Sequence, residues 1–285
     1  MKKYKVILTI FLFSLLLTLL IAPLRGYVSV MSSSLAGFIA YFLLTNYFIY
    51  KFKSKLKDYW IVLAILAGVC ILQVPIHIID FKLTLGTLPD LLIHCLGIVI
   101  GFIYYKSNKI IGVTVTALAL CFVLYMYFDG FYRWSHKLTY GTFFYTVSEE
   151  VPEFAMANSK GIDFTNKDLT DKIVVFDFWT TSCGVCFRKF PILQEEFDTY
   201  KNTPGIEFYA VNIPSKRDSI GKAERMMSEY EYTFPVLYAK SDSLAKLFKV
   251  FAYPTVIIIR NGKEIIFRGN IEGVDGIIEK NNNGS

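Results

Sequence analysis

Residues Ile173–Cys186 read IVVFDFWTTSCGVC and decide the fold of the C-terminal half. The first seven, Ile173–Trp179, are rich in β-branched and aromatic side chains and predict a buried strand. After a short loop, two cysteines separated by two residues stand where a helix is expected to begin. The N-terminus of a helix carries free N–H groups and partial positive charge, which favour the thiolate of Cys183, the attacking species in disulfide exchange. The stretch therefore predicts a reversible, redox-active pair, Cys183 and Cys186.

The placement of cysteine and histidine argues against a metal site in the C-terminal half. A structural zinc ion normally takes four ligands, and Cys183 and Cys186 are the only cysteines there. The remaining cysteines lie in apolar runs upstream: Cys70, Cys95 and Cys121. The histidines lie upstream as well: His77, His94 and His136. We therefore expect no metal, no cofactor and no Cys–His hydrolase.

The N-terminal half is apolar enough to be a membrane domain. The chain has 285 residues, of which 54% are hydrophobic, and the excess lies in the first half. Five segments are long enough to span a bilayer, at about Val6–Ala22, Tyr27–Tyr50, Tyr59–Ile79, Pro89–Tyr105 and Ile110–Phe128. The first could pass for a signal peptide, but no small-residue cleavage pattern follows it, so we expect it to be retained as a helix.

The basic residues predict how these segments are oriented. One set of loops and the N-terminus hold nine of them: Lys2, Lys3, Lys5, Lys51, Lys53, Lys55, Lys57, Lys106 and Lys109. The other side holds four: Arg25, Lys82, Arg133 and Lys137. The positive-inside rule then places the N-terminus in the cytoplasm, and five spans place everything after Phe128 outside it. We expect a multi-pass protein of the bacterial cytoplasmic membrane whose thiol pair faces an oxidising space. The net charge of +6 is explained by residues that border the spans, so a nucleic-acid partner is not expected.

The segments predict a transmembrane domain over 1–128, a linker over 129–150, a soluble domain over 151–280 and a disordered tail over 281–285. Strands are expected at Ile173–Trp179, Glu207–Ile213, Val236–Tyr238, Thr255–Arg260 and Lys263–Arg268. Helices are expected at Cys183–Lys201, Ser219–Tyr230, Ser243–Phe248 and Val274–Lys280. Alternating strands and helices that end in a hairpin predict an α/β domain with a mixed sheet, attached to an all-α membrane domain of five helices.

Asp177 interrupts the apolar run that leads to the cysteines. A buried carboxylate is costly unless it is paired or neutral, and desolvation raises its pKa. We expect Asp177 to accept the proton of Cys186 during disulfide exchange. The alternative is an aspartate at an exposed strand end. Pro254, just before an apolar strand, is compatible with a cis bond or with an ordinary strand entry.

Several motifs in the same order resemble the thioredoxin superfamily, specifically the membrane-anchored TlpA/ResA-like thiol-disulfide oxidoreductases. The matching pieces run from Pro152 to about Gly269: Pro152-Glu153-Phe154, Leu169–Lys172, Phe178–Cys186, Phe190-Pro191, Val211-Asn212, Phe234–Val236, Tyr253–Thr255 and Asn261-Gly262. The resemblance implies a thioredoxin-like fold and a protein-disulfide reductase activity.

The resemblance also implies a role for individual residues. Cys183 would be the exposed nucleophile and Cys186 the buried resolving thiol. Pro254 would be a cis-proline facing the disulfide, and the Tyr253 backbone would pair with an extended substrate segment. Trp179 would lie beside the site, either contacting substrate or simply packing in the core.

The chain departs from the family pattern around the cysteines. Ser182 replaces a usual tryptophan, Val185 replaces a common proline, and Lys189 stands where ResA-like members often carry glutamate. Lys189 and the adjacent Arg188 should stabilise the thiolate, whereas the Asp177 carboxylate acts in the opposite direction. The direction of electron flow therefore stays open.

The membrane half weakly resembles VanZ-like membrane domains over Leu72-Gln73, Pro89–Gly97 and Gly101, although His94 departs from an expected asparagine. Asp90 and His94 are spaced for a local pair, which we interpret as structural, with a transport, lipid-headgroup or metal role as the alternative. The three upstream cysteines lie near mid-membrane on separate helices. We interpret them as small apolar residues, and a transmembrane electron relay as the less favoured alternative.

The sequence thus predicts a membrane-anchored, extracytoplasmic thiol-disulfide oxidoreductase that reduces disulfides of envelope proteins. The expected partners are envelope protein thiols, including those of cytochrome c maturation, the lipid bilayer, and a separate membrane electron donor of the CcdA/DsbD type. Two alternatives remain: an oxidant or isomerase of the same class, and a non-enzymatic redox sensor attached to the membrane domain.

Overall fold

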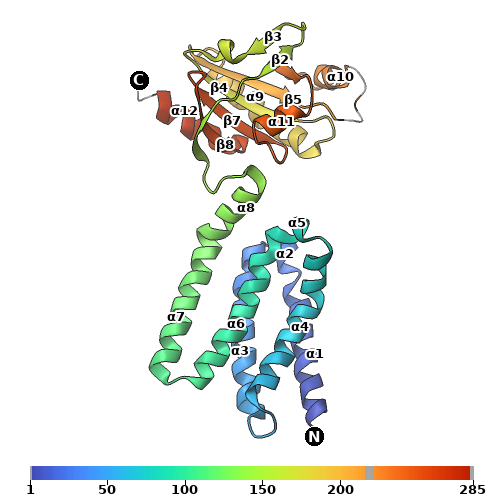
Figure 1. The fold of residues 1–285 in the computed structure, drawn as a ribbon, viewed down its shortest axis with the longest axis vertical. Helices are drawn as coiled ribbons and strands as arrows, with labels where there is room; N and C mark the ends of the chain where they lie inside the picture. Colours follow the sequence, from blue (N-terminus) through green and yellow to red (C-terminus); the bar gives the residue numbers. More distant parts are fainter. Residues whose placement is uncertain (1, 216–217, 219–220, 283–285) are drawn as a thin grey trace. The chain divides into compact units, whose positions relative to one another are not determined.

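The computed structural model describes residues 2–215, 218 and 221–282, and the chain divides into two compact units, 1–135 and 136–285 (Figure 1). Each unit has its own apolar core.

The N-terminal unit is helical. Its elements are α1 (Lys3–Ile21), α2 (Leu24–Tyr27), α3 (Val30–Phe52), α4 (Asp58–Ile79), α5 (Phe81–Thr84), a 3₁₀ turn η1 (Leu85–Thr87), α6 (Leu88–Lys106), α7 (Lys109–Tyr125), a π-helical turn η2 (Met126–Gly130) and the start of α8 (Phe131–Tyr140). Five helical stretches in the described chain are long and apolar enough to cross a membrane. The predicted all-α domain with five long, apolar helices is therefore confirmed.

Local sequence explains where these helices begin and how they pack. The Ser29 hydroxyl accepts a hydrogen bond from the Ser32 N–H at 3.0 Å and caps α3, and Asn108 caps α7 in the same way. Gly97 and Gly101 of α6 lie directly against the backbone of α3, where any Cβ would collide with it. These two glycines therefore form a small-residue packing surface that holds α6 against α3.

The C-terminal unit is a mixed, eight-stranded sheet covered by helices. Its strands are β1 (Thr146–Glu150), β2 (Ala155–Asn158), β3 (Asp163–Thr165), β4 (Ile173–Trp179), β5 (Ile206–Asn212), β6 (Val236–Ala239), β7 (Thr255–Arg260) and β8 (Glu264–Gly269). They lie in the order β1-β8-β7-β4-β5-β6-β2-β3, with β4, β5 and β6 parallel and the other pairs antiparallel. The remaining elements are the 3₁₀ turns η3 (Asn166–Leu169) and η4 (Ile271–Gly273) and the helices α9 (Gly184–Tyr200), α10 (Lys222–Glu229), α11 (Ser243–Leu247) and α12 (Val274–Asn282). The predicted α/β thioredoxin-like fold is confirmed.

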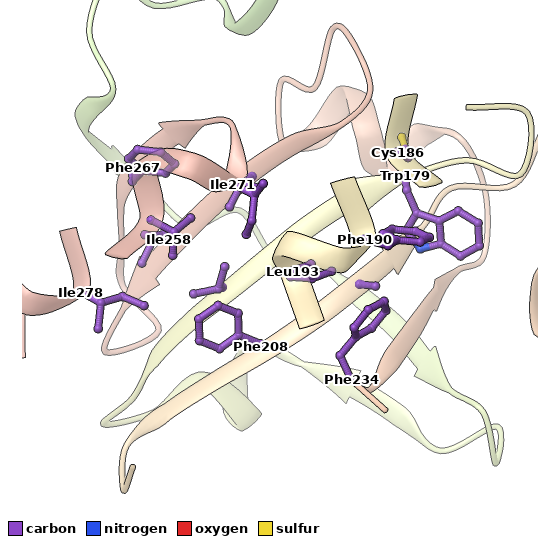
Figure 2. Close-up of a cluster of buried hydrophobic side chains, with 14 of the residues drawn as sticks. Trp179, Cys186, Phe190, Leu193, Phe208, Phe234, Ile258, Phe267, Ile271 and Ile278 are labelled. Atoms are coloured by element: carbon purple, nitrogen blue, oxygen red, sulfur yellow. The ribbon is translucent and has the colours of Figure 1, made fainter. Parts of the chain in front are cut away.

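The central strand β4 is buried on both faces, which explains its nearly continuous apolar sequence. Val175 and Trp179 point to the face covered by α9, where they share an apolar cluster with Phe190 and Leu193 of that helix. Figure 2 shows Trp179, Phe190 and Leu193 in this cluster. The alternate residues point to the opposite face, into a cluster with α11 and Phe248. Because side chains alternate along a strand, Asp177 lies on the α9 face, between Val175 and Trp179.

The segment 129–150, expected as a linker, contains ordered elements. It carries the whole of α8, and its last five residues form β1, which pairs antiparallel with β8. Burial supports this arrangement: Arg268 of β8 is 1% exposed and donates to the Phe248 carbonyl at 2.5 Å, with Glu149 of β1 at 3.4 Å as its counter-charge. The expected tail is helical as far as Asn282, and positions 283–285 lie outside the described residues.

Candidate active site

The two cysteines lie where the loop after β4 becomes α9. Cys183 is the N-cap residue, and its Sγ accepts a hydrogen bond from the Cys186 N–H at 3.1 Å. The two side chains are joined by a disulfide, with their Cα atoms 5.3 Å apart. Cys183 is partly exposed, whereas Cys186 is completely buried. An attacking partner can therefore reach only the sulfur of Cys183, and that sulfur lies at the positive end of the α9 dipole.

Asp177 lies on the α9 face of the sheet, six residues before Cys183. Its neighbours across the sheet are Ala210 of β5 and Val256 of β7, both completely buried. Within the described residues, neither carboxylate oxygen has a hydrogen-bond partner. Desolvation by burial raises the pKa of Asp177 to about 8. The carboxyl group is therefore mostly neutral at pH 7 and can gain or lose a proton near that pH.

The loop that precedes β7 lies at the same end of the sheet as the cysteines. Thr255 pairs with Phe178 in the antiparallel register, which places residues 252–254 next to the end of β4. The Tyr253–Pro254 peptide bond is cis, as the family resemblance implied. Tyr253 is half-buried, and Phe251 in the same loop is 67% exposed. The loop before β7 thus carries an exposed apolar side chain two residues before Tyr253.

Trp179 packs in the core, which is one of the two alternatives that the sequence left open. Its side chain has no exposed surface and packs edge-to-face against Phe187 and Phe190 of α9, with ring centroids 5.7 and 5.4 Å away. Figure 2 shows Trp179 beside Phe190 in the core. The Trp179 ring therefore packs against α9, the helix that Cys183 caps.

The positive charge around the thiols is smaller than the sequence indicated. The Lys189 ammonium forms an ion pair with Glu272 of η4, which offsets its charge. Arg188 is exposed, and its guanidinium lies on the side of Gly184 at the helix start. The stabilisation of a thiolate on Cys183 therefore rests on the α9 N-terminus and Arg188.

A polar cluster that the sequence analysis missed holds the loop before Cys183. The Thr181 hydroxyl donates to Asp218, which also accepts from the Ser215 N–H at 2.9 Å and pairs with Lys222 at 3.0 Å. Burial alone would raise the pKa of Asp218, but these three donors together lower it. The i, i+4 spacing of Asp218 and Lys222 is the only sequence signal of this cluster, and nothing in the sequence connects it to Thr181.

In the part of the chain that the structure describes, no three His, Cys, Asp or Glu side chains gather into a possible metal site. The site itself contains a reachable sulfur on Cys183, a buried sulfur on Cys186, and the buried carboxyl group of Asp177 on the sheet face that α9 covers.

Comparison with known proteins agrees with this geometry. Residues 147–268 match the model of the AhpC/TSA family. A thiol-disulfide oxidoreductase ResA of Bacillus cereus is 27% identical over 183 residues, which are 61% of this chain and 98% of that protein. The ResA of Oceanobacillus iheyensis is 30% identical over 125 residues, 42% of this chain and 63% of that protein. A crystal structure of a putative thiol:disulfide interchange protein DsbE from Chlorobium tepidum is 26% identical, covers 47% of this chain and 95% of its own, and superposes with a TM-score of 0.40.

These matches confirm the resemblance to ResA-like proteins in the C-terminal half. They do not test the VanZ-like resemblance of the N-terminal half, which stays a prediction.

Proposed function

Because residues 147–268 form an AhpC/TSA thioredoxin-like domain related to the ResA thiol-disulfide oxidoreductases, we propose that this chain reduces disulfides of envelope proteins outside the cytoplasm. One observation supports this most directly. The disulfide at the start of α9 has one reachable sulfur and one buried sulfur, and an unpaired carboxyl group lies on the sheet face beneath that helix.

The reaction has two steps. The Cys183 thiolate attacks a substrate disulfide, forms a mixed disulfide and releases one substrate thiolate, which takes up a proton. The Cys186 thiol then gives its proton to Asp177 and attacks Cys183, which forms the Cys183–Cys186 disulfide and releases the second substrate half as a thiolate, which takes up a proton from water. Since the loop and α9 hold both sulfurs together, the second step is unimolecular and fast.

Asp177 suits this role because its pKa of about 8 lies near that of a thiol. A carboxylate with an ordinary pKa near 4 would accept a thiol proton far less readily. After the cycle, two electrons must return the disulfide to the dithiol. A separate membrane electron donor of the CcdA/DsbD type would supply them.

The extracytoplasmic location is supported by charge. Nine basic residues flank the spans on the side of the N-terminus and four on the other side, and five helices in the described chain are long enough to span. With that topology the pair works where protein disulfides form and persist. Thiols of cytochrome c maturation are one expected substrate class.

Trapping tests the proposal. A Cys186→Ser variant keeps the attacking sulfur but cannot resolve the mixed disulfide, so substrates should accumulate as covalent adducts on Cys183 and be identified by mass spectrometry. The control is the Cys183→Ser, Cys186→Ser double variant, which should carry no adduct. Absence of envelope-protein adducts on Cys186→Ser under native expression would contradict the proposal.

One observation favours the reverse direction, an oxidant or isomerase. The α9 N-terminus and Arg188 stabilise the Cys183 thiolate, and a stabilised thiolate makes a disulfide more oxidising. The measured reduction potential separates the two functions: a potential as low as that of thioredoxin supports the reductase, and one near that of DsbA supports the oxidant.

A further inference from the structure

The helical unit contains a pocket of about 720 Å³ at the end where α1 and α4 begin. Figure 1 shows the starts of these two helices at one end of the unit, next to the loop that joins α3 to α4. The volume lies within the range of ordinary ligand sites, about 300–1,000 Å³. The start of α1, the α3–α4 loop and the end of α6 contribute five lysines to its lining: Lys3, Lys53, Lys55, Lys57 and Lys106.

Most of this positive charge has no carboxylate partner. Asp58 also lines the pocket, and it forms an ion pair with Lys106, with Oδ2 and Nζ 2.5 Å apart. Among the described residues, no ion pair is formed by the other four lysines: Lys3, Lys53, Lys55 and Lys57. Like charges around one hollow repel each other, and an anion placed between them removes that repulsion. The charge balance of the pocket therefore favours an anionic ligand.

Two helix N-termini add to the positive potential. Lys3 is the first residue of α1 and Lys57 is the N-cap residue of α4, and neither helix has a side-chain cap hydrogen bond. In contrast, α3 and α7 are capped by Ser29 and Asn108. The first N–H groups of α1 and α4 therefore lack a side-chain acceptor from their N-cap residues, and N–H groups at a helix start bind phosphate oxygens well.

The remaining large side chains of the lining are apolar or aromatic. Leu56 is buried, Ile7 and Phe102 are half-buried, and Tyr59 and Trp60 are 49% and 46% exposed. Tyrosine and tryptophan at the end of a span are typical of the membrane interface. A ligand that carries both a phosphate and hydrocarbon chains contacts both kinds of lining, whereas a small soluble anion contacts only the lysines.

We propose that this pocket binds the phosphate headgroup of an anionic phospholipid. The lysine ammonium groups and the first N–H groups of α1 and α4 surround the phosphate, and the apolar side chains contact the glycerol and the first part of the acyl chains. With the topology proposed above, the pocket faces the cytoplasmic leaflet, whose anionic lipids attract basic segments. The inference does not depend on the proposed function of Cys183 and Cys186.

Lipid titration of the purified full-length chain tests the site. The chain in detergent is titrated with phosphatidylglycerol or with phosphatidylcholine of the same acyl chains, and native mass spectrometry gives the dissociation constant of each complex. Phosphatidylglycerol should bind about tenfold more tightly or better, and added salt should reduce the difference. Equal binding of the two lipids would overturn the inference.

A soluble competitor separates a lipid from a free phosphate ester, which has the same anionic group. Glycerol phosphate at millimolar concentration should leave phosphatidylglycerol bound, because it makes no contact with the apolar part of the lining. Displacement of the lipid by glycerol phosphate would assign the pocket to a soluble phosphate ester and contradict the proposed lipid.

Two double variants separate the pocket from the general charge of the surface. Lys53→Gln with Lys55→Gln should weaken the binding of phosphatidylglycerol about 25-fold, because each lysine at a membrane surface contributes about fivefold. The matched control is Lys51→Gln with Lys109→Gln, which removes the same charge from the ends of α3 and α7 outside the pocket lining. This control should stay within about twofold of the unmodified chain. Equal weakening in both double variants, or none in the first, would overturn the inference.

Discussion

Asp177 sets the pH response of the proposed resolving step. It must be deprotonated to accept the Cys186 proton, and with a pKa of about 8 only about a tenth of it is deprotonated at pH 7. The rate of resolution should therefore rise with pH and level off above pH 8. In Asp177→Asn the rate at pH 7 should fall about 100-fold and the rise centred near pH 8 should disappear. Stopped-flow measurement of mixed-disulfide decay checks this.

The matched control is Asp171→Asn, an exposed aspartate in the loop before β4, which should keep the unmodified pH profile. A profile for Asp177→Asn that still has its midpoint near pH 8 would assign that titration to another group.

Asp177 should also lower the free energy of unfolding of the domain at neutral pH. Its pKa is higher in the folded domain, about 8 against an ordinary value of 3.8, so the folded state holds the proton more tightly. The contribution of Asp177 to the free energy of unfolding is therefore most favourable below about pH 4. This contribution is lost as the pH rises through 8. Asp177→Asn should raise the free energy of unfolding by at most about 4 kcal/mol at pH 7 and by almost nothing at pH 4. Urea unfolding in detergent, followed by Trp179 fluorescence in a Trp60→Phe, Trp134→Phe background, measures the difference.

For single residues, the sequence predicted which side chains are reactive more reliably than it predicted which side chains are in contact. The spacing of the cysteines and the position of Asp177 in an apolar strand were sufficient to predict the site. The burial of Trp179 and the pairing of Lys189 with Glu272 were not predictable, because each depends on a partner from another element.

At the scale of elements, an ion pair between Glu149 of β1 and Arg268 of β8 adds to the backbone pairing of β1 with the sheet. Arg268 is nearly inaccessible on β8, and Glu149 of β1 lies within ion-pair distance of both Arg268 and the exposed Lys249. Burial alone would raise the pKa of Glu149, but the two cations lower it, so its stabilising contribution is present above its ordinary pKa near 4.5 and is lost as pH falls further.

Glu149→Gln should therefore lower the free energy of unfolding of the C-terminal unit by about 1–3 kcal/mol at pH 7, because it leaves the buried Arg268 charge without its counter-charge. The neighbouring exposed Glu150→Gln is the control and should change it little. Urea unfolding at pH 7 and pH 3.5 measures both, and equal values for the two variants at pH 7 would exclude this role for Glu149.

The sequence predicted strands β4 to β8 and did not predict the short strands β1 and β3. β4, β5 and β7 are apolar runs, and α9 follows a clear start signal, so their patterns are strong. β1 reads TVSEE and β3 has three residues, and neither carries an apolar alternation. Each of these strands forms because it pairs with a neighbouring strand. That pairing is not visible in the local sequence.

At the scale of the whole molecule, the two units can be tested for independence. If the chain were a redox sensor for its membrane domain, loss of Cys183 and loss of Asp90 would have the same effect. The proposed enzyme predicts otherwise. Asp90→Ala removes a buried group of the membrane unit and should leave the rate of disulfide reduction by the purified chain within about twofold of the unmodified rate, whereas Cys183→Ser should abolish it. A dithiothreitol-coupled insulin reduction assay gives both rates. Equal loss in both variants would favour the sensor.

The central claim is that the Cys183 sulfur acts outside the cytoplasm, and its accessibility to a charged reagent tests this most directly. Intact cells are treated with a membrane-impermeant maleimide. They express a Cys186→Ser variant in which Cys70, Cys95 and Cys121 are also serine, so that Cys183 is the only thiol. The account predicts that Cys183 is labelled in intact cells to the same extent as after lysis. Labelling that appears only after the cells are opened would place the site in the cytoplasm and contradict the account.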